Sequence, residues 1–416
     1  MTNRQEDSPK SILFISGLDI WSMGANKGGP ALSQTLLGYA NAGWRVGFIT
    51  GNKGTSEHTL NGVSTFRFDA PNLKRSYLNP RLPFVLRSFL YVMWWLYFQV
   101  KTFVMAQSLN KKYSFDVIYS YEILGVFIGK ILSLLWRVPF VTRFQGTVFD
   151  VRWREGWFKY IYAWDHWLSL RTPADLVIMT DDGTQGDKVL AKLRVDMTKV
   201  RFWMNGTDKE AFADLTSAQE AKNRLGIAHR HVLLTVSRLV GWKKVDRAII
   251  ALPSVLKEVH DTLLIIVGEG DEKENLMKLC EALGVKDHVL FTGSVPHHEV
   301  KYYMAAAAVF LSLYTWSNVG NPLLEAMLAG KCIITIANGD TPRVINNGVT
   351  GILLEEDNLA PLPDLIIDLL NNSNRVDELG NNARQYGLEN FKTWEKRMEE
   401  EISEIASLIN LRYSAD

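Results

Sequence analysis

The stretch SNVGNPLLEAMLAG (Ser317–Gly330) decides how the second half of this chain is organised. It follows a predicted buried strand, AVFLSL (Ala308–Leu313), and enters an apolar helix, so it lies at the carboxyl end of a strand. Open α/β sheets bind ligands at such ends. Asn321 is a suitable N-cap and Pro322 suits the first helical position, which leaves free backbone N–H groups at the positive end of the helix. Such a helix end attracts phosphate.

Glu325 falls within the first turn of this predicted helix, where its carboxylate can accept hydrogen bonds from a sugar hydroxyl. A plainer interpretation stays open: Gly320-Asn321-Pro322 is only a turn, and Glu325 only complements the helix dipole. Short Gly/Asn motifs recur by chance, so a ligand site requires other parts of the chain to direct groups to the same place.

The composition describes a globular chain of 416 residues, with 47% apolar and 22% charged residues. That length exceeds one ordinary core and favours two domains of about 200 residues each. The net charge of +1 gives no sign of a nucleic-acid partner, and none is expected. Cys280 and Cys332 are isolated thiols without metal-ligand spacing, which fits a reducing cytosol.

No secretion signal or transmembrane helix is predicted. Met1–Lys10 is polar and lacks the apolar core of a signal sequence. The longest apolar region, Leu82–Leu109, is interrupted by charged and amide side chains, and its uninterrupted part, Ser88–Phe98, is too short to cross a bilayer.

Two series of apolar segments alternate with helical stretches along the chain. The first series predicts strands at Ser11–Ser16, Trp44–Thr50, Asp116–Ser120, Val138–Thr142, Asp175–Met179 and Lys199–Trp203. The second predicts strands at His231–Ser237, Leu263–Gly268, His288–Gly293, Ala308–Leu313 and Lys331–Ile336. Continuous apolar strands separated by helices indicate parallel sheets covered on both faces. The predicted fold class is therefore α/β, with two similar halves, a cleft between them and a linker near Asn205–Asp214.

Loops at the predicted strand ends carry cationic or small residues. Arg238 and Lys243 lie five residues apart after one strand, and together their side chains can grip a diphosphate. Gly268 and Gly270 follow the next strand, and the first strand of the chain runs into the glycine-containing loop Gly24–Pro30. Each loop also has a plain interpretation, as a solvated basic loop or an ordinary turn. The shared edge of the second sheet favours a ligand site.

With these residues in view, the chain resembles a retaining glycosyltransferase of GT-B family 4 over most of its length. The resemblance runs through Lys27-Gly28-Gly29, Asn205-Gly206-Thr207-Asp208, Ser237-Arg238-Leu239 with Lys243, Gly268-Glu269-Gly270, Gly293-Ser294-Val295, Gly320 with Glu325-Ala326-Met327 and Gly330, and Asn347-Gly348 with Thr350-Gly351. It implies a GT-B architecture of two Rossmann-like parallel-sheet domains. Residues 1–208 would bind the acceptor, residues 209–390 the nucleotide-sugar, and residues 391–416 would form a helix that packs back on the first domain.

The resemblance also implies roles for individual residues. Arg238 and Lys243 would neutralise the donor diphosphate, Glu325 would hold the ribose hydroxyls, the backbone around Val295 would meet the base, and Gly29 would allow close approach. The substrate-binding positions implied in this way are Gly28, Gly29, Gly268, Gly270, Val295, Ser317, Asn318, Val319, Gly320, Asn321, Leu324 and Glu325. No metal and no cofactor are expected beside the UDP- or GDP-linked sugar, because the fold uses Arg, Lys and helix dipoles in place of an Asp-x-Asp metal site.

Two positions depart from the pattern of the family that the chain resembles. Ser317 stands where a second glutamate is usual, eight residues before Glu325, so any role that requires a carboxylate on that residue is lost. Gln145 stands where a catalytic-site histidine is usual, and an amide cannot act as a general base. Gln145 can still bind the donor sugar, and transfer in which the leaving phosphate takes the acceptor proton would tolerate the change.

The N-terminal half has the character of a membrane-contacting surface. Between Asp69 and Asp116 there is no acidic residue, and Arg87, Trp94 and Lys101 recur every seven residues, so they share one side of a helix. A second aromatic cluster contains Trp153, Trp157, Phe158, Tyr160, Tyr162, Trp164 and Trp167. These helices either pack on the sheet or a partner chain, or contact anionic lipid; the absence of acidic residues favours lipid.

These observations predict a metal-independent hexosyltransferase that acts with retention on a lipid-linked or other saccharide acceptor, in surface polysaccharide or glycolipid synthesis. It would lie in the cytoplasm, peripherally on the inner face of the cell membrane. Two alternatives stay open: a non-catalytic GT-B subunit that scaffolds a partner glycosyltransferase, and a sugar-nucleotide epimerase. The adjacent residues His297 and His298 are interpreted as loop residues and not as ligands.

Overall fold

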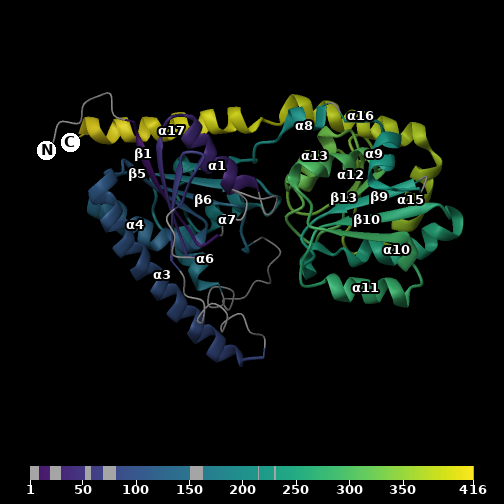
Figure 1. Cartoon of the computed structure of the whole chain (residues 1–416), viewed down its shortest axis with the longest axis horizontal. Helices are drawn as coiled ribbons and strands as arrows, with labels where there is room; N and C mark the ends of the chain where they lie inside the picture. Colours follow the sequence, from purple (N-terminus) through teal and green to yellow (C-terminus); the bar gives the residue numbers. More distant parts are fainter. Residues whose placement is uncertain are drawn as a thin grey trace.

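The computed structural model describes residues 9–18, 30–51, 58–68, 81–149, 163–213, 215–228 and 231–415. Their strands form two sheets, one in each half of the chain (Figure 1). The first sheet has the order β3-β4-β2-β1-β5-β6-β7-β8 and the second the order β11-β10-β9-β12-β13-β14. All neighbouring strands of known register are parallel except the β3–β4 pair, which is antiparallel. The predicted α/β fold with two parallel-sheet domains is confirmed.

The strands of the first sheet are β1 (Ser11–Ser16), β2 (Arg45–Thr50), β3 (His58–Leu60), β4 (Val63–Arg67), β5 (Val117–Tyr121), β6 (Phe140–Phe144), β7 (Leu176–Thr180) and β8 (Val200–Trp203). The helices around it are α1 (Pro30–Asn41), α3 (Phe84–Tyr113), α4 (Val126–Trp136), α6 (Trp164–Arg171) and α7 (Gly186–Lys192). Two buried apolar clusters, one containing Leu13 and Ile118 and the other Ile12 and Val117, cover the two faces of this sheet. Alternate residues of β1 and β5 fall in different clusters, as expected for strands buried on both faces.

The strands of the second sheet are β9 (His231–Val236), β10 (Thr262–Val267), β11 (Val289–Gly293), β12 (Val309–Ser312), β13 (Cys332–Ile336) and β14 (Ile352–Leu354). The helices that follow or cover them are α8 (Lys209–Ala213), α9 (Ala218–Leu225), α10 (Asp246–Glu258), α11 (Lys273–Ala282), α12 (Val300–Ala306), α13 (Asn321–Leu328), α14 (Thr341–Val344), α15 (Leu362–Asn371) and α16 (Ser373–Asn390). Leu233 and Leu264 belong to one buried cluster, and Leu234 and Ile265 to the other.

Every predicted strand is present, with its ends shifted by at most two residues. Strands β3, β4 and β14 were not predicted. β3 and β14 have three residues each, which is too short for a periodic signal. All three strands lie at sheet edges or next to one.

The last helix, α17 (Trp394–Ala415), returns from the second half and lies along the first sheet (Figure 1). Its Met398, Ile405 and Ile409 are buried in the apolar cluster that contains Ile12. The chain crosses between the halves twice, and the two crossings lie side by side, because the Thr207 N–H donates to the Lys392 carbonyl at 2.9 Å.

A buried ionic cluster fastens α17 to strands β5 and β6. The Glu401 carboxylate lies 3.3 Å from Arg143 Nη1 and 3.0 Å from Arg397 Nη2, and it accepts a 2.8 Å hydrogen bond from the Tyr119 hydroxyl. Burial and the charge of Glu401 raise the pKa of Tyr119 well above its ordinary value, so the phenol stays protonated as a donor. Buried charges are stable only when paired and hydrogen-bonded in this way.

The structure of α3 contradicts the prediction that Arg87, Trp94 and Lys101 share one exposed side of the helix. Trp94 is 4% exposed and packs in the core with Phe98, so it does not share an outer surface with Lys101. The exposed side of the helix is instead apolar, through Phe84, Val85, Leu86, Phe89, Val92, Met93, Leu96, Val100 and Val104. The amino-terminal half of α3 extends past the rest of the N-terminal domain (Figure 1). The predicted aromatic residues from Trp153 to Tyr162 lie outside the described residues.

Candidate functional site

The second sheet reverses its strand order between β9 and β12, and ligands of open α/β sheets bind at such a switch point. Arg238 follows β9, and the segment that enters α13 follows β12. A hydrogen bond of 3.0 Å from the Thr315 N–H to the Trp242 carbonyl joins these two loops. The residues predicted from two distant parts of the sequence therefore meet at one place.

The side chains of Arg238 and Lys243 lie next to aromatic rings at this switch point. The Lys243 ammonium lies 3.7 Å from the ring centroid of Tyr314 and 4.1 Å from that of Trp242, while the Arg238 guanidinium lies 5.9 Å from the Trp242 centroid. Burial, with the Arg238 charge adding to it and Asp182 opposing it, lowers the pKa of Lys243 to about 7. A diphosphate bound beside these two cations would favour the charged form of Lys243 and pair with both side chains.

The glycines after β10 have a packing role of their own. Gly268 has a φ of +142°, and a Cβ there would lie 1.8 Å from the Ser237 carbonyl oxygen. A Cβ on Gly270 would lie 2.1 Å from the Leu239 carbonyl oxygen. Because they lack side chains, the two glycines allow the loop after β10 to pack closely on the backbone of Ser237 and Leu239, which flank Arg238.

Helix α13 begins one residue earlier than predicted, so Glu325 lies past its first turn and not within it. Gly320 is the N-cap, in an extended conformation, and Asn321 and Pro322 are the first two helical residues. Asn321 therefore caps nothing, and its side-chain oxygen instead accepts a hydrogen bond of 3.3 Å from Asn205 Nδ2. The N-cap prediction for Asn321 is wrong, because Gly320 adopts the required conformation and leaves the Asn321 amide for a contact with the linker.

Several predicted substrate-binding residues in this segment are buried and bonded within the protein. Asn318 is 1% exposed and bonds to the Tyr314 carbonyl and to Asn338 Oδ1. Val319 and Leu324 belong to the core, and half-buried Val295 packs against the same cluster. These side chains hold the loops in place, and any contact with a ligand there comes from the backbone. Gly28 and Gly29 lie outside the described residues.

Glu325 has a partner that the sequence did not suggest. Its Oε1 lies 2.8 Å from Nε2 of His297, a residue of the short turn after β11. This hydrogen bond raises the pKa of His297, against the effect of burial. The carboxylate is 8% exposed and the imidazole is 46% exposed. The turn that contains His297 therefore folds back onto α13, a contact that the interpretation of His297 as a loop residue did not include.

Gln145 lies at the carboxyl end of β6 and faces the linker. Its Nε2 donates to the Tyr121 hydroxyl at 2.7 Å, and its Oε1 accepts from Asn205 Nδ2 at 3.0 Å. The Gln145 N–H donates to Glu122, whose pKa is raised to about 7, chiefly by burial. Asn205 thus touches both Gln145 and Asn321, one from each half of the chain.

The strand-end loops of the two halves contact each other directly. The Val319 N–H donates to the Asp182 carbonyl at 3.1 Å, and the Gln185 N–H donates to Asp340 Oδ2 at 3.2 Å. Asp182 directly follows Asp181 at the end of a predicted strand, a position whose acidic pair could have been noticed in the sequence but was not. Among the described residues, no group of three His, Cys, Asp or Glu side chains could hold a metal ion.

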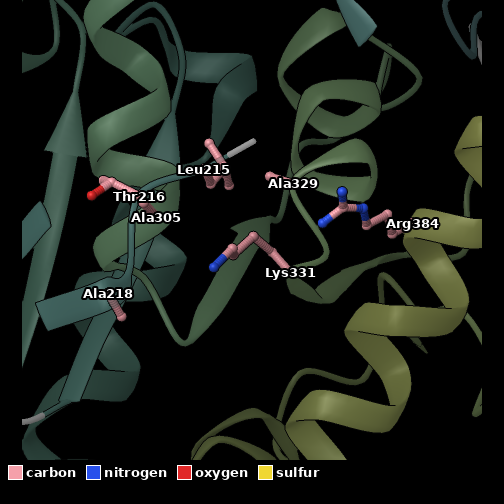
Figure 2. Close-up of a pocket in the computed structure, with 7 residues that line it drawn as sticks. All are labelled: Leu215, Thr216, Ala218, Ala305, Ala329, Lys331 and Arg384. Atoms are coloured by element: carbon pink, nitrogen blue, oxygen red, sulfur yellow. The ribbon is translucent and has the colours of Figure 1, made fainter. Parts of the chain in front are cut away.

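A pocket of about 490 Å³ lies elsewhere on the C-terminal half (Figure 2). Its lining residues are Leu215, Thr216, Ala218, Ala305, Ala329, Lys331 and Arg384. Lys331 directly precedes β13, so this pocket lies at the amino ends of the strands, opposite the edge that carries Arg238 and Lys243. It is separate from the candidate site.

Two parallel-sheet domains that meet at their strand ends, with a last helix returning to the first domain, define the GT-B fold of glycosyltransferases. Structures of this class align with nearly the whole chain. The sucrose-phosphate synthase of Thermosynechococcus elongatus aligns with a TM-score of 0.75 at 19% identity, over 98% of this chain and 100% of its own. Anabaena HepE in complex with UDP-glucose aligns with a TM-score of 0.71 at 20% identity, over 95% and 99%. At these identities the likeness shows the fold alone.

Sequence comparison points to the same class through the C-terminal half. Residues 217–386 match the family described as "Glycosyl transferases group 1". A Mycolicibacterium smegmatis protein named GDP-mannose-dependent alpha-(1-6)-phosphatidylinositol monomannoside mannosyltransferase is 31% identical over 200 residues, which is 46% of this chain and 52% of that protein. The chain thus aligns with about half the length of this relative.

Proposed function

We propose that this chain is a retaining glycosyltransferase that moves a hexosyl group from a UDP- or GDP-linked sugar to a saccharide acceptor, without a metal ion. The observation that carries the proposal is the position of Arg238 and Lys243, which lie together at the switch point of the second sheet. The family match over residues 217–386 supports it.

The site is suited to a leaving diphosphate. As the bond between sugar and phosphate breaks, negative charge develops on the phosphate oxygens, and Arg238 and Lys243 stabilise that charge. The amino end of α13 adds the positive end of its helix dipole. Because Gln145 cannot take a proton, the departing phosphate accepts the proton of the acceptor hydroxyl.

We further propose a lipid-linked acceptor at the cytoplasmic face of a membrane. Helix α4 packs against α3 and also has exposed apolar side chains, at Phe127, Leu134 and Leu135. Arg81, Lys101, Lys111 and Lys112 are exposed near it, and α3 contains no acidic residue. Apolar side chains flanked by cations suit the surface of an anionic bilayer.

By length and composition alone, α3 would also pass as a membrane-spanning helix. One third of its most apolar window, 33%, is buried inside the protein. Trp94, Trp95 and Phe98 anchor it to the N-terminal domain. These contacts favour a helix that lies on the bilayer surface over one that crosses it.

The experiment begins with a thermal-shift screen over UDP-, GDP- and ADP-sugars, because a ligand that binds only the folded chain raises its melting temperature. The nucleotide-sugar that binds is then tested for hydrolysis and transfer with wild type, Arg238→Ala and Arg224→Ala. Arg224 is the matched control, since its guanidinium also stacks on an aromatic ring, 4.0 Å from the Tyr302 centroid, but on α9.

Turnover that Arg238→Ala abolishes and Arg224→Ala preserves would support the proposal. Binding without turnover on any acceptor would instead indicate a non-catalytic GT-B subunit that scaffolds a partner enzyme. Interconversion of the donor sugar without an acceptor would indicate an epimerase.

A further inference from the structure

A carboxylate from the N-terminal half contacts the loop of the C-terminal half that leads into α13. Asp182, two residues after β7, accepts a 2.8 Å hydrogen bond at Oδ2 from the Ser317 hydroxyl of the other half. Ser317 precedes α13, so the carboxylate of Asp182 reaches the segment that enters this helix. Asp182 thus belongs to the N-terminal half of the sequence but contacts the candidate site of the C-terminal half.

The orientation of this carboxylate is fixed from several directions. Its Oδ1 accepts hydrogen bonds from the Thr184 hydroxyl at 2.6 Å and the Thr184 N–H at 3.1 Å. A Cβ on Gly146, which has a φ of +103°, would lie 2.3 Å from Oδ2, so the glycine leaves the space that the carboxylate occupies. Asp182 is half-buried, and these contacts hold its carboxylate in one orientation, as preorganised electrostatic stabilisation requires.

The charge of Asp182 acts on the cationic pair. The negative charge of Asp182 raises the pKa of Lys243, and the positive charge of Lys243 lowers the pKa of Asp182. The two side chains therefore interact electrostatically. The pKa of Asp182 is raised, chiefly by burial, and the hydrogen bonds from Thr184 and Ser317 reduce that rise. When ionised, Asp182 places a negative charge beside Ser317, on the same loop whose Thr315 N–H bonds to Trp242 next to Lys243.

We propose that Asp182 is a catalytic residue that contacts the sugar being transferred and balances the positive charge that develops on its ring. This inference rests on the proposed glycosyltransferase function. The bond between the anomeric carbon and the diphosphate breaks, and its electron pair leaves with the diphosphate held by Arg238 and Lys243. The acceptor oxygen bonds to the anomeric carbon and its proton passes to a leaving phosphate oxygen. Asp182 stays charged throughout.

This assignment accounts for the neutral side chain at position 317. The carboxylate that Ser317 lacks is supplied from across the crevice, and the Ser317 hydroxyl donates to it. A carboxylate from the opposite domain is present only when the two halves are in contact, so the sugar site is complete only in that arrangement.

The competing explanation is that Asp182 only holds the two halves together. Gln185 provides a matched test of that explanation, because its Nε2 donates to the Gly339 carbonyl at 3.2 Å, also across the domains, and it carries no charge. Gln185 has a φ of +53°, a conformation that asparagine tolerates well. Gln185→Asn therefore shortens the side chain and removes this contact without straining the backbone.

The experiment compares wild type, Asp182→Asn, Gln185→Asn, Asp182→Ser and the double variant Asp182→Ser with Ser317→Glu. The probe is whichever of UDP-glucose and GDP-mannose raises the melting temperature of the wild type. Calorimetry gives the affinity for the bare nucleoside diphosphate, and donor hydrolysis gives kcat. We expect Asp182→Asn to keep the nucleotide affinity within about twofold and to lose about 10²- to 10³-fold in kcat. Gln185→Asn should lose less than about threefold in kcat.

The double variant keeps the proposal testable if the asparagine substitution disturbs folding. It returns a carboxylate from the other side, and kcat should recover at least about tenfold over Asp182→Ser alone. An active wild type whose Asp182→Asn variant keeps kcat within threefold, or loses no more than Gln185→Asn, would overturn the assignment of Asp182. A wild type that binds and turns over neither nucleotide-sugar would instead overturn the proposed function.

Discussion

The ammonium of Lys243 lies 3.7 Å from the ring centroid of Tyr314, so a residue after β9 and a residue after β12 share one contact. The contact desolvates Lys243, and its pKa falls to about 7. A lysine that is half charged near neutral pH binds an anion with a pH dependence that an ordinary lysine lacks.

We therefore predict that nucleoside diphosphate binding takes up a proton above neutral pH. A bound diphosphate favours the charged lysine, so its pKa is higher in the complex than in the free protein, and the affinity falls as the pH rises above about 7. Calorimetry at pH 8 in buffers of different ionisation enthalpy measures the proton uptake. Lys243→Met should weaken binding at least about tenfold and remove this uptake, whereas the neighbouring Lys244→Gln should do neither. Binding without proton uptake in the wild type would count against the prediction.

The hydrogen bond between His297 and Glu325 gives a second prediction. The carboxylate raises the pKa of His297, so Glu325→Gln should lower that pKa toward the ordinary value for histidine. NMR titration of the imidazole resonances measures the change, with His298→Ala as the variant that assigns the neighbouring signal. We also expect Glu325→Gln to weaken nucleotide binding about tenfold, because a charged acceptor for hydroxyl groups is lost. An unchanged His297 titration would show that the two side chains do not interact in solution.

The ionic cluster of Glu401 predicts a large loss of stability on substitution. Both Glu401 and Arg143 have fully buried side chains, so Glu401→Gln leaves the Arg143 charge without its anion, and the free energy of unfolding should fall by about 3–5 kcal/mol. Glu404→Gln is the control on the same helix, since Glu404 pairs with partly exposed Arg201 and should cost less than about 1 kcal/mol. Urea denaturation of the three proteins measures the difference. Equal losses for the two variants would contradict the proposed role of burial.

The exposed apolar side of α3 predicts binding to anionic vesicles. Replacing Leu96 and Val100 together by aspartate should weaken that binding at least about tenfold, because apolar area is lost and negative charge is added beside an anionic surface. The matched control replaces Ile250 and Met277, which are 56% and 43% exposed on the C-terminal half. Co-sedimentation with vesicles of phosphatidylglycerol and phosphatidylcholine measures the effect. A wild type that ignores these vesicles, or a control that weakens binding equally, would refute the membrane contact.

The sequence alone determined the class of fold and which residues form the candidate donor site. Apolar strands such as Ser11–Ser16 and His231–Val236 are continuous in the sequence because both of their faces are buried, and this pattern survives without any knowledge of long-range contacts. Arg238, Lys243 and Glu325 were selected because they follow strands whose carboxyl ends share one edge. That reasoning is local and needs only the rule that parallel strands end together.

The tertiary structure decided which side chains meet. The contact of Asp182 with Ser317 spans 135 residues, and that of His297 with Glu325 spans 28, so neither has a local pattern in the sequence. The seven-residue spacing of Arg87, Trp94 and Lys101 correctly predicted a helix but not which side of it faces outward. That side depends on which part of α3 the sheet and α4 cover, and burial of this kind is a property of the assembled domain.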